Sequence, residues 1–257
     1  MTASRDNRFQ DFFEDVKYVT LKNYLYNYLL RKRAVEKAMK NEEKEVVLEI
    51  GSGISPVLAS WERIVYSDLS FSALRTLRRL LGNGYYVVAD GMNLPFKAHA
   101  FSHVISSEVL EHLTDDHKAL REIACVTKPG GSLVVTFPHR RLYFANDDRF
   151  VNHYRRYELH EMAARLKEVG LCPVFVCKVL GPLEKITMII VTGCVAILQR
   201  VEGKEETHLQ RSKLPDVVIK LFKWTNRIYA VLARIDAGVM PRALSTVLLI
   251  KAVKNNG

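Results

Sequence analysis

Hydrophobic and polar positions alternate along most of the chain in a way that separates strands from helices. Seven short apolar runs are typical of buried strands, and they cover residues 46–50, 64–66, 85–89, 104–106, 132–137, 172–179 and 244–253. Helical periodicity that stops at glycine or proline predicts helices over 70–81, 110–127 and 158–169. Strands that alternate with helices predict an α/β fold, with a parallel sheet and helices on both of its faces.

Two segments fall outside this alternation. Near the N-terminus, apolar residues recur at steps of three and four positions, which predicts an amphipathic helix; they are Tyr18, Leu21, Leu25, Tyr28 and Leu29. Residues 182–242 show a helical pattern and are rich in apolar and basic side chains. This segment is too long for a plain connection between strands. The domain organisation that we expect has three parts: an N-terminal helical region over 1–44, a core over 45–181 and 243–257, and a helical insertion over 182–242.

The composition narrows the class of protein. Of the 257 residues, 48% are apolar and 26% are charged, which is typical of a globular protein and excludes a disordered or coiled-coil chain. No secretory signal is recognised, and the longest nearly unbroken apolar run, residues 186–198, is shorter than the about 20 residues that span a bilayer. We therefore expect a cytoplasmic protein.

Charge and cysteine content add two further points. The net charge of +10 favours an anionic partner, which could be nucleic acid, a membrane surface or an acidic substrate. The four cysteines form no CxxC pair and show no Cys/His spacing typical of metal sites, so no metal is predicted.

A glycine-containing turn follows the first predicted strand and is the first candidate for ligand binding. Gly51 and Gly53 can take positive φ and allow a ligand close to the backbone. Asp68 ends the second strand, near the spacing of about 20 residues at which a carboxylate reaches a ribose hydroxyl pair. Pro56 stands where a dinucleotide-binding motif has its third glycine. An adenosine-containing ligand without a pyrophosphate is therefore favoured over a nicotinamide dinucleotide.

Five motifs in order carry a family resemblance. They read VVLEIGSG, YSDLS, VVADGMNLPF, FSHVISSEVLEHL and LREIACVTKPGGSLVVTFP. Over about residues 45–180 this series resembles the class I S-adenosylmethionine-dependent methyltransferases, in particular their UbiE-like, methyltransferase type 11 branch. The resemblance implies a doubly wound, Rossmann-like sheet of seven strands, six parallel and one antiparallel. S-adenosylmethionine is the implied cofactor and S-adenosylhomocysteine the product.

The resemblance also implies a cofactor site. Its residues would be Glu49, Gly51, Ser52, Gly53, Asp68, Leu69, Asp90, Gly91, Met92, Ser107 and Glu108. The glycine turn and Glu49 would meet the methionine part, Asp68 the ribose and Asp90 the adenine amino group. Ser107 and Glu108 would lie at the end of the fourth strand, facing the acceptor. From the residues alone, Glu49 and Asp90 could also be turn residues, and Asp68 a helix N-cap.

The segment after the fifth strand, residues 138–157, is dense in histidine, tyrosine and arginine. It falls where a doubly wound fold places the rim of its active site, so His139, His153 and Tyr154 are candidate catalytic residues, with the two histidines as bases. The alternative is a loop that Arg155 and Arg156 pin to nearby carboxylates.

The insertion contains a basic amphipathic pattern. At about 100° per residue, an apolar face is formed by Leu214, Val217, Val218, Leu221, Phe222, Ile228, Tyr229, Leu232 and Ile235. The opposite face holds Lys220, Lys223, Arg227 and Arg234. Such a helix can lie on an anionic membrane, or its apolar face can pack on the sheet. A lid or a dimer interface is a further alternative for the insertion.

Together these features predict methyl transfer to a small or lipid-like apolar acceptor, such as an isoprenoid, a quinone or a lipid-linked sugar. Two alternatives stay open: a nucleic-acid methyltransferase that uses the basic surface, and a non-catalytic protein that binds S-adenosylmethionine. Residues 106–109 read Ser-Ser-Glu-Val in place of the Asn/Asp-Pro-Pro-aromatic signature of enzymes that methylate exocyclic amines of nucleic acids. This disfavours a DNA substrate. The oligomeric state and the acceptor atom are left open.

Overall fold

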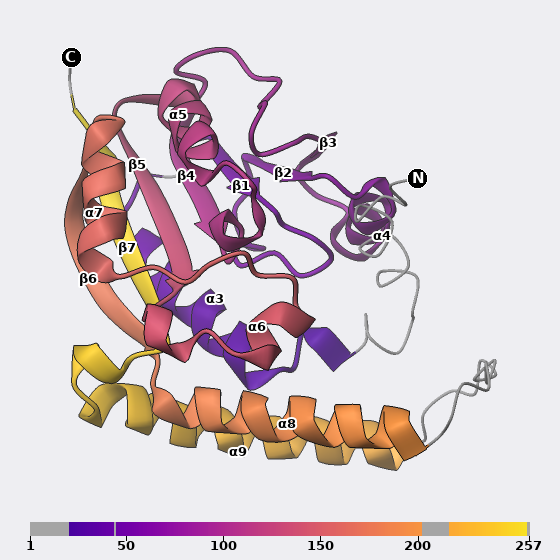
Figure 1. The fold of residues 1–257 in the computed structure, drawn as a ribbon. Helices are drawn as coiled ribbons and strands as arrows, with labels where there is room; N and C mark the ends of the chain where they lie inside the picture. The colour runs from indigo at the N-terminus through magenta and orange to yellow at the C-terminus, as the bar shows by residue number, and fades with distance from the viewer. Residues whose placement is uncertain (1–20, 44, 202–215, 256–257) are drawn as a thin grey trace, which may run out of the picture.

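The computed structural model describes residues 21–43, 45–201 and 216–255, and its core is a seven-stranded sheet (Figure 1). The strand order is β3-β2-β1-β4-β5-β7-β6. The strands are β1 (Val47–Ile50), β2 (Ile64–Asp68), β3 (Tyr85–Val88), β4 (Phe101–Ser107), β5 (Thr127–Pro138), β6 (Leu171–Leu180) and β7 (Val247–Lys254). Only β7 runs antiparallel to its neighbours. The expected sheet of six parallel strands and one antiparallel strand is therefore confirmed.

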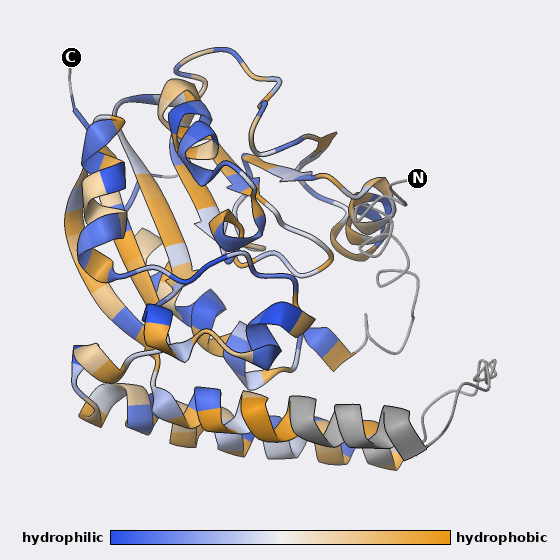
Figure 2. Ribbon diagram, in the orientation of Figure 1, coloured by the Kyte–Doolittle hydropathy of each residue, from blue (hydrophilic) through white to orange (hydrophobic). Residues whose placement is uncertain are grey.

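Helices cover both faces of the sheet. They are α3 (Tyr26–Met39), α4 (Phe71–Leu81), α5 (Asp116–Val126), α6 (Asn146–Phe150), α7 (Leu159–Glu168), α8 (Pro182–Val201) and α9 (Asp216–Val239), with single 3₁₀ turns at η1 (Leu110–His112), η2 (Arg141–Tyr143) and η3 (Arg242–Leu244). Alternate strand residues face opposite layers: Leu48 packs with α5 and α7, whereas Val47 packs with α3, α4 and α9. Figure 2 shows apolar residues concentrated along the strands between these two layers.

The order of the strands creates a switch point between β1 and β4. The chain passes from β1 to β2 on one side, while β4 pairs with β1 on the other side, and both neighbours run parallel to β1. Ile50 is in register with both Ser67 and Ser106. Ligands of open α/β sheets bind beyond the carboxyl ends of the strands at such a point, so the turns that follow these residues form one edge.

Helix α5 begins later than the pattern predicts. Residues 110–127 were expected to form one helix, but Leu110–His112 is a separate 3₁₀ turn and the α-helix starts at Asp116. The Asp115 carboxylate caps it by accepting a hydrogen bond from the backbone N–H of Lys118 at 2.8 Å. The expected start was wrong because this cap interrupts the apolar periodicity.

Strand β5 begins earlier than predicted. The sequence pattern placed its start at Ser132, after the Pro-Gly-Gly stretch, whereas pairing with β4 starts at Thr127 and passes through a register shift. Gly131 makes this route possible: a Cβ there would lie 2.7 Å from the carbonyl oxygen of Ser102. The glycines therefore allow close passage of two backbones rather than ending the strand.

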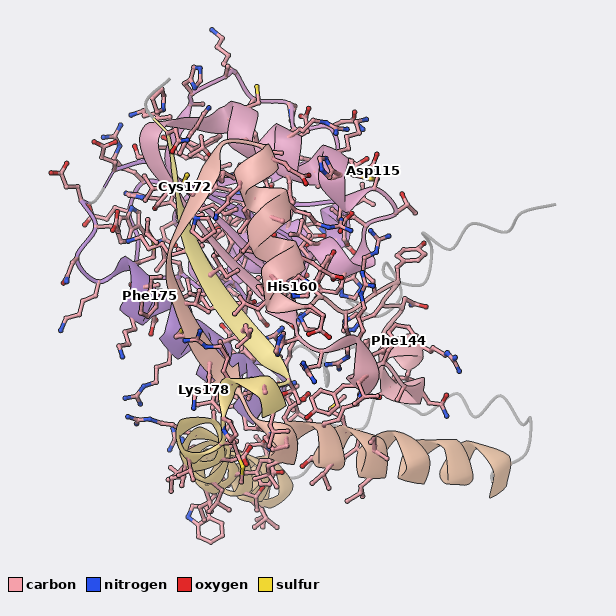
Figure 3. The ribbon with its side chains drawn as sticks, turned by 60° about the vertical axis from the view of Figure 1, so that its left-hand side comes forward. Asp115, Phe144, His160, Cys172, Phe175 and Lys178 are labelled. Atoms are coloured by element: carbon pink, nitrogen blue, oxygen red, sulfur yellow. The ribbon has the colours of Figure 1, made fainter. Side chains whose placement is uncertain are left out.

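The segment before β7 contains α8 and α9, which lie side by side along one end of the molecule (Figure 1). Helix α9 packs on α3, where Tyr26 and Tyr229 form an edge-to-face contact with ring centroids 4.6 Å apart. Figure 3 shows β6 at the sheet edge, with Lys178 near the end of α9. Its ammonium group donates to the backbone oxygens of Gly238 and Met240, which are acceptors at the carboxyl end of that helix.

The apolar face predicted for residues 214–235 is turned away from the protein core over much of α9. Ala233 and Ala237 make the buried contacts, whereas a stripe of apolar side chains, each at least 43% exposed, runs along the helix. This α9 stripe consists of Val217, Leu221, Trp224, Ile228, Val231, Leu232, Ile235 and Val239. Leu214 lies outside the described residues. Among the described residues, no helix is long and apolar enough to cross a membrane.

Candidate active site

The turn after β1 can be built only with glycine at its first position. Gly51 has φ of +69° and Gly53 has φ of +52°. A Cβ on Gly51 would lie 2.4 Å from a Cγ atom of Val109. The backbone N–H groups of Gly51 and Ser52 both donate to the carbonyl oxygen of Ser67. The turn is therefore held between the ends of β1, β2 and β4.

Asp68 connects this turn to the start of α4. One carboxylate oxygen accepts from the backbone N–H of Gly53 and the other from that of Ser70, both at 2.8 Å. Burial raises the pKa of Asp68, while these two hydrogen bonds act in the opposite direction. A carboxylate has about four acceptor positions, so each oxygen can also accept from a ligand hydroxyl. The N-cap of α4 is Ser70, so the reading of Asp68 as an N-cap was wrong.

Glu49 supports the same loop from inside the sheet. Its two oxygens accept from the backbone N–H groups of Val57 at 2.7 Å and Leu58 at 3.2 Å. Burial raises the pKa of this carboxyl to about 7, against the lowering effect of both hydrogen bonds. The side chain thus makes the contacts of a loop-bracing residue, which was the alternative to a direct contact with a ligand amino group.

Asp90, Gly91 and Met92 form the turn after β3. The Asp90 carboxylate accepts from the backbone N–H of Met92 at 2.8 Å, as expected of a turn-forming residue. Gly91 lies against the end of β1, since a Cβ there would be 3.5 Å from Ile50. The sulfur of Met92 accepts a hydrogen bond from the hydroxyl of Thr114. The structure therefore brings this turn to the same edge of the sheet as the glycine turn.

Ser107 and Glu108 end strand β4. The hydroxyl of Ser107 is 2.9 Å from that of Thr136 on β5. Glu108 has φ of +55°, and one of its carboxylate oxygens is 3.6 Å from the Arg31 guanidinium on α3. Its other oxygen is buried and has no hydrogen-bond partner. The N-terminal helix thus reaches the edge where the candidate residues meet.

These residues fit a ligand that carries an adenosine and an amino acid part. The hydroxyl of Ser52 in the glycine turn is buried without a hydrogen-bond partner, and so is one oxygen of Glu108. Asp68 keeps free acceptor positions on both oxygens. The remaining predicted residue, Leu69, exposes its side chain beside Asp68. A turn that leaves its backbone open at Gly51 and is flanked by spare polar atoms suits S-adenosylmethionine.

The three candidate catalytic residues lie in different surroundings. His139 is buried, where one ring nitrogen is 2.9 Å from the carbonyl oxygen of Ser245 and burial lowers its pKa. Tyr154 is exposed and contacts the backbone of Glu111 through its own N–H. His153 places Nε2 3.8 Å from a carboxylate oxygen of Glu111, just beyond β4. Of the three, His153 is the one whose side chain reaches the 3₁₀ turn η1 that follows β4.

An ion network that the sequence pattern does not predict fixes the loop of His153. Asp148 accepts from Nε of Arg156 at 2.7 Å and from the ammonium of Lys185 at 2.9 Å, and all three are buried. Arg155 pairs separately with Asp116 at 2.7 Å. The alternative in which both arginines pin this loop to carboxylates is therefore what the structure shows. One signal was present in the sequence, because Lys185 stands at the beginning of an apolar run.

Comparisons with known proteins agree with this geometry. Residues 48–135 match the family model described as a methyltransferase domain. The demethylmenaquinone methyltransferase of Streptomyces griseus is 32% identical over 110 residues, which are 41% of this chain and 48% of that protein. The chain thus spans about half the length of this curated relative.

Two solved structures show the same fold. A chain from the complex between the Haloferax volcanii Trm112 methyltransferase activator and a methyltransferase aligns with a TM-score of 0.63 at 16% identity, over 96% of this chain and 98% of that chain. Phosphoethanolamine N-methyltransferase 2 of Haemonchus contortus, in complex with S-adenosyl-L-methionine, aligns with a TM-score of 0.59 at 19% identity, over 96% and 60%.

The sheet order, the glycine turn at the switch point and the match over residues 48–135 agree with one class of protein. Over that segment the chain is similar to the methyltransferase domain of the methyltransferase type 11 family model. The five sequence motifs indicated the same family.

Proposed function

We propose that this protein transfers the methyl group of S-adenosylmethionine to a small or lipid-like apolar acceptor. The observation that carries the proposal is the meeting of the Gly51 turn, Asp68 and the end of β4 at one switch point of the sheet. The family match and the Streptomyces griseus relative, whose name states a demethylmenaquinone substrate, support a methyl transfer to a quinone-like molecule.

The chain's own residues would bind and orient the reactants. Asp68 would accept from the ribose hydroxyls, and the absence of a side chain at Gly51 would let the methionine part lie against the backbone. The cofactor supplies an activated methyl group on a sulfonium. Most of the rate can then come from holding the acceptor atom in line, about 3 Å from that methyl group in a dry site. Ser107 and Glu108 at the end of β4 would face the acceptor.

Calorimetric titration with S-adenosylhomocysteine tests the proposed cofactor. We expect micromolar binding to the purified protein and no binding of NADH under the same conditions. Asp68→Ala removes acceptors for both ribose hydroxyls, so it should weaken binding by about 1.5–3 kcal/mol, the scale of hydrogen bonds to a charged group. Glu168→Gln, a change at an exposed carboxylate paired with His117, is the matched control and should leave the affinity unchanged.

Two outcomes would contradict this assignment. Unchanged affinity in a folded Asp68→Ala protein would remove the ribose role of Asp68. No binding of S-adenosylhomocysteine to ligand-free, folded protein would overturn the proposed activity. Binding without methyl transfer to any acceptor in membrane lipid extracts would favour the non-catalytic alternative.

The exposed α9 stripe supports the proposal that the protein works at the cytoplasmic surface of a membrane. Lys220, Arg227 and Arg234 are exposed on the same helix, and their charge suits anionic lipid headgroups. Figure 2 shows apolar residues on the described parts of the α8–α9 pair, at the end of the molecule. An acceptor dissolved in the bilayer would then lie within reach of the site.

Vesicle sedimentation tests this membrane contact. The protein should sediment with vesicles that contain phosphatidylglycerol, and less with pure phosphatidylcholine. Trp224→Ser with Ile228→Ser should reduce the bound fraction several-fold, because two exposed apolar anchors are lost. Val174→Ser, at an exposed apolar residue on β6, is the control. Equal binding by the double variant and the control would contradict a role for the α9 stripe.

A further inference from the structure

A cluster of imidazole and carboxylate groups lies just beyond the end of β4. Glu111, His112 and His153 each offer one ligand atom, and these atoms lie within 4.8 Å of one another. The first two belong to the 3₁₀ turn η1, and His153 belongs to the loop after α6. Two segments that are distant in the sequence therefore bring three potential metal ligands together.

Glu111 has no partner that would explain its burial. Its side chain is completely buried, and neither carboxylate oxygen has a hydrogen-bond partner. The nearest ring nitrogen of His153 is 3.8 Å away, which is too long for a hydrogen bond. Burying a carboxylate without such partners costs several kcal/mol. A group held at this cost suggests a ligand that the polypeptide itself does not supply.

A second, partly buried acid lies near Glu111. Glu108 keeps one carboxylate oxygen buried without a hydrogen-bond partner, and its charge disfavours the ionised form of Glu111. A cation bound at Glu111 would relieve this repulsion. Arg31 and Arg156 offset part of this repulsion but donate no hydrogen bond to Glu111.

The two histidines are held by outer contacts that orient metal ligands in many proteins. Nδ1 of His153 is 2.9 Å from a carboxylate oxygen of Asp148, which leaves Nε2 directed toward Glu111. His112 is hydrogen-bonded to the backbone of Asn152. The centroids of the His112 and His153 rings lie 4.7 Å apart. Carboxylates and backbone carbonyls fix the tautomer of ligating histidines in this way.

We propose that Glu111, His112 and His153 bind a divalent metal ion. Two imidazoles with one carboxylate suit Zn²⁺, Mn²⁺ or Fe²⁺ better than Ca²⁺. No metal is predicted from the sequence, because it shows no Cys/His spacing typical of a metal site. The adjacent pair Glu111 and His112 is completed only by a histidine from another loop.

The place of the ion gives it a role that rests on the proposed function. It would lie at the end of β4, on the side where the acceptor is expected. A metal ion there can hold an acceptor oxygen and lower its pKa, so the acceptor would be a hydroxyl or an enol rather than a carbon without an adjacent oxygen. Binding of the ion itself does not depend on methyl transfer.

Metal titration of the full, untagged chain tests the site. After removal of metals with EDTA, calorimetry with Zn²⁺ and separately with Mn²⁺ should show one tight site for at least one of the two ions, and the bound ion should raise Tm. Glu111→Gln should weaken that binding at least 100-fold. Asp148→Asn should weaken it about 10–100-fold, the effect of losing an outer contact. His117→Gln, at an exposed histidine paired with Glu168, should change nothing.

The outcomes separate the two proposals. The metal site is overturned if the wild type binds neither ion, if Glu111→Gln binds as tightly as the wild type, or if His117→Gln removes the binding. The Glu111→Gln variant is expected to fold, because it replaces an unpartnered acid by a neutral group of the same shape. Its affinity for S-adenosylhomocysteine should be retained, so loss of the metal alone does not contradict the cofactor assignment.

Discussion

Replacing Asp148 with alanine is expected to lower the free energy of unfolding by about 3–5 kcal/mol, the cost of breaking a buried ion pair by removing one partner. Its carboxylate lies in the interior and accepts from Arg156, Lys185 and His153 at 2.7–2.9 Å. Without this carboxylate, the nearest acidic group to the buried guanidinium of Arg156 would be that of Asp147, at 4.0 Å. A buried cation would thus be left without a close counter-ion.

The pKa of Asp148 reflects the same contacts with its positively charged partners. Burial raises it, but the hydrogen bond from His153 and the charge of Arg156 outweigh burial and hold it well below its usual value. A carboxyl with a lowered pKa in the folded state stabilises the protein above the pKa of the unfolded chain, about 3.9, and this contribution is lost as the pH falls further. The network therefore contributes fully near neutral pH.

Urea unfolding at pH 7 measures this effect, with Asp115→Ala as the matched control. Asp115 also accepts a backbone hydrogen bond, but it is an exposed N-cap whose loss costs about 0.5–2 kcal/mol. If Asp148→Ala is no more destabilising than Asp115→Ala, the network does not hold α6 to α8. The loop of His153 should become more susceptible to proteolysis in the variant, since the side chains of both His153 and Arg156 contact this carboxylate.

The central sheet could be predicted because its signals are local. Each strand is a short apolar run, and the turn after β1 contains the glycines that its positive φ values require. The limits of α5 and β5 depend on contacts beyond the local pattern. Asp115 selects the start of α5, and the close passage of Gly131 past Ser102 extends β5. Periodicity contains no information on either contact.

The candidate site was predictable where it follows the strand ends and not where it depends on loop packing. Asp68 lies where its position after β2 predicted, and it contacts the glycine turn. The predicted bases differ, since His139 is tied to the backbone of Ser245 while His153 reaches Glu111. The sequence alone could not distinguish these two histidines as candidate bases, because both stand in the same polar segment. Glu111 was not a candidate because the role proposed for it depends on burial, which only the packing of η1 against the loop of His153 reveals.

Gly51→Ala is expected to reduce the affinity for S-adenosylhomocysteine at least 100-fold and to destabilise the fold. A residue other than glycine at φ of +69° costs about 1–2 kcal/mol. The new Cβ would also lie 2.4 Å from a Cγ atom of Val109, and such overpacking costs about 1–3 kcal/mol more. The turn must then shift away from the end of β4, and it carries the Gly53 N–H that Asp68 holds.

Gly82→Ala separates these two causes. Gly82 has a similar φ of +72°, but a Cβ there would meet no atom within 4 Å. It should therefore show the backbone cost alone, with unchanged affinity for S-adenosylhomocysteine. Adding Val109→Ala to Gly51→Ala should recover part of the stability, because the clashing methyl groups are removed. Calorimetry and urea unfolding of the four proteins measure both effects. If Gly51→Ala behaves like Gly82→Ala in both affinity and stability, the turn tolerates a side chain. The proposal that a ligand approaches its backbone closely would then be wrong.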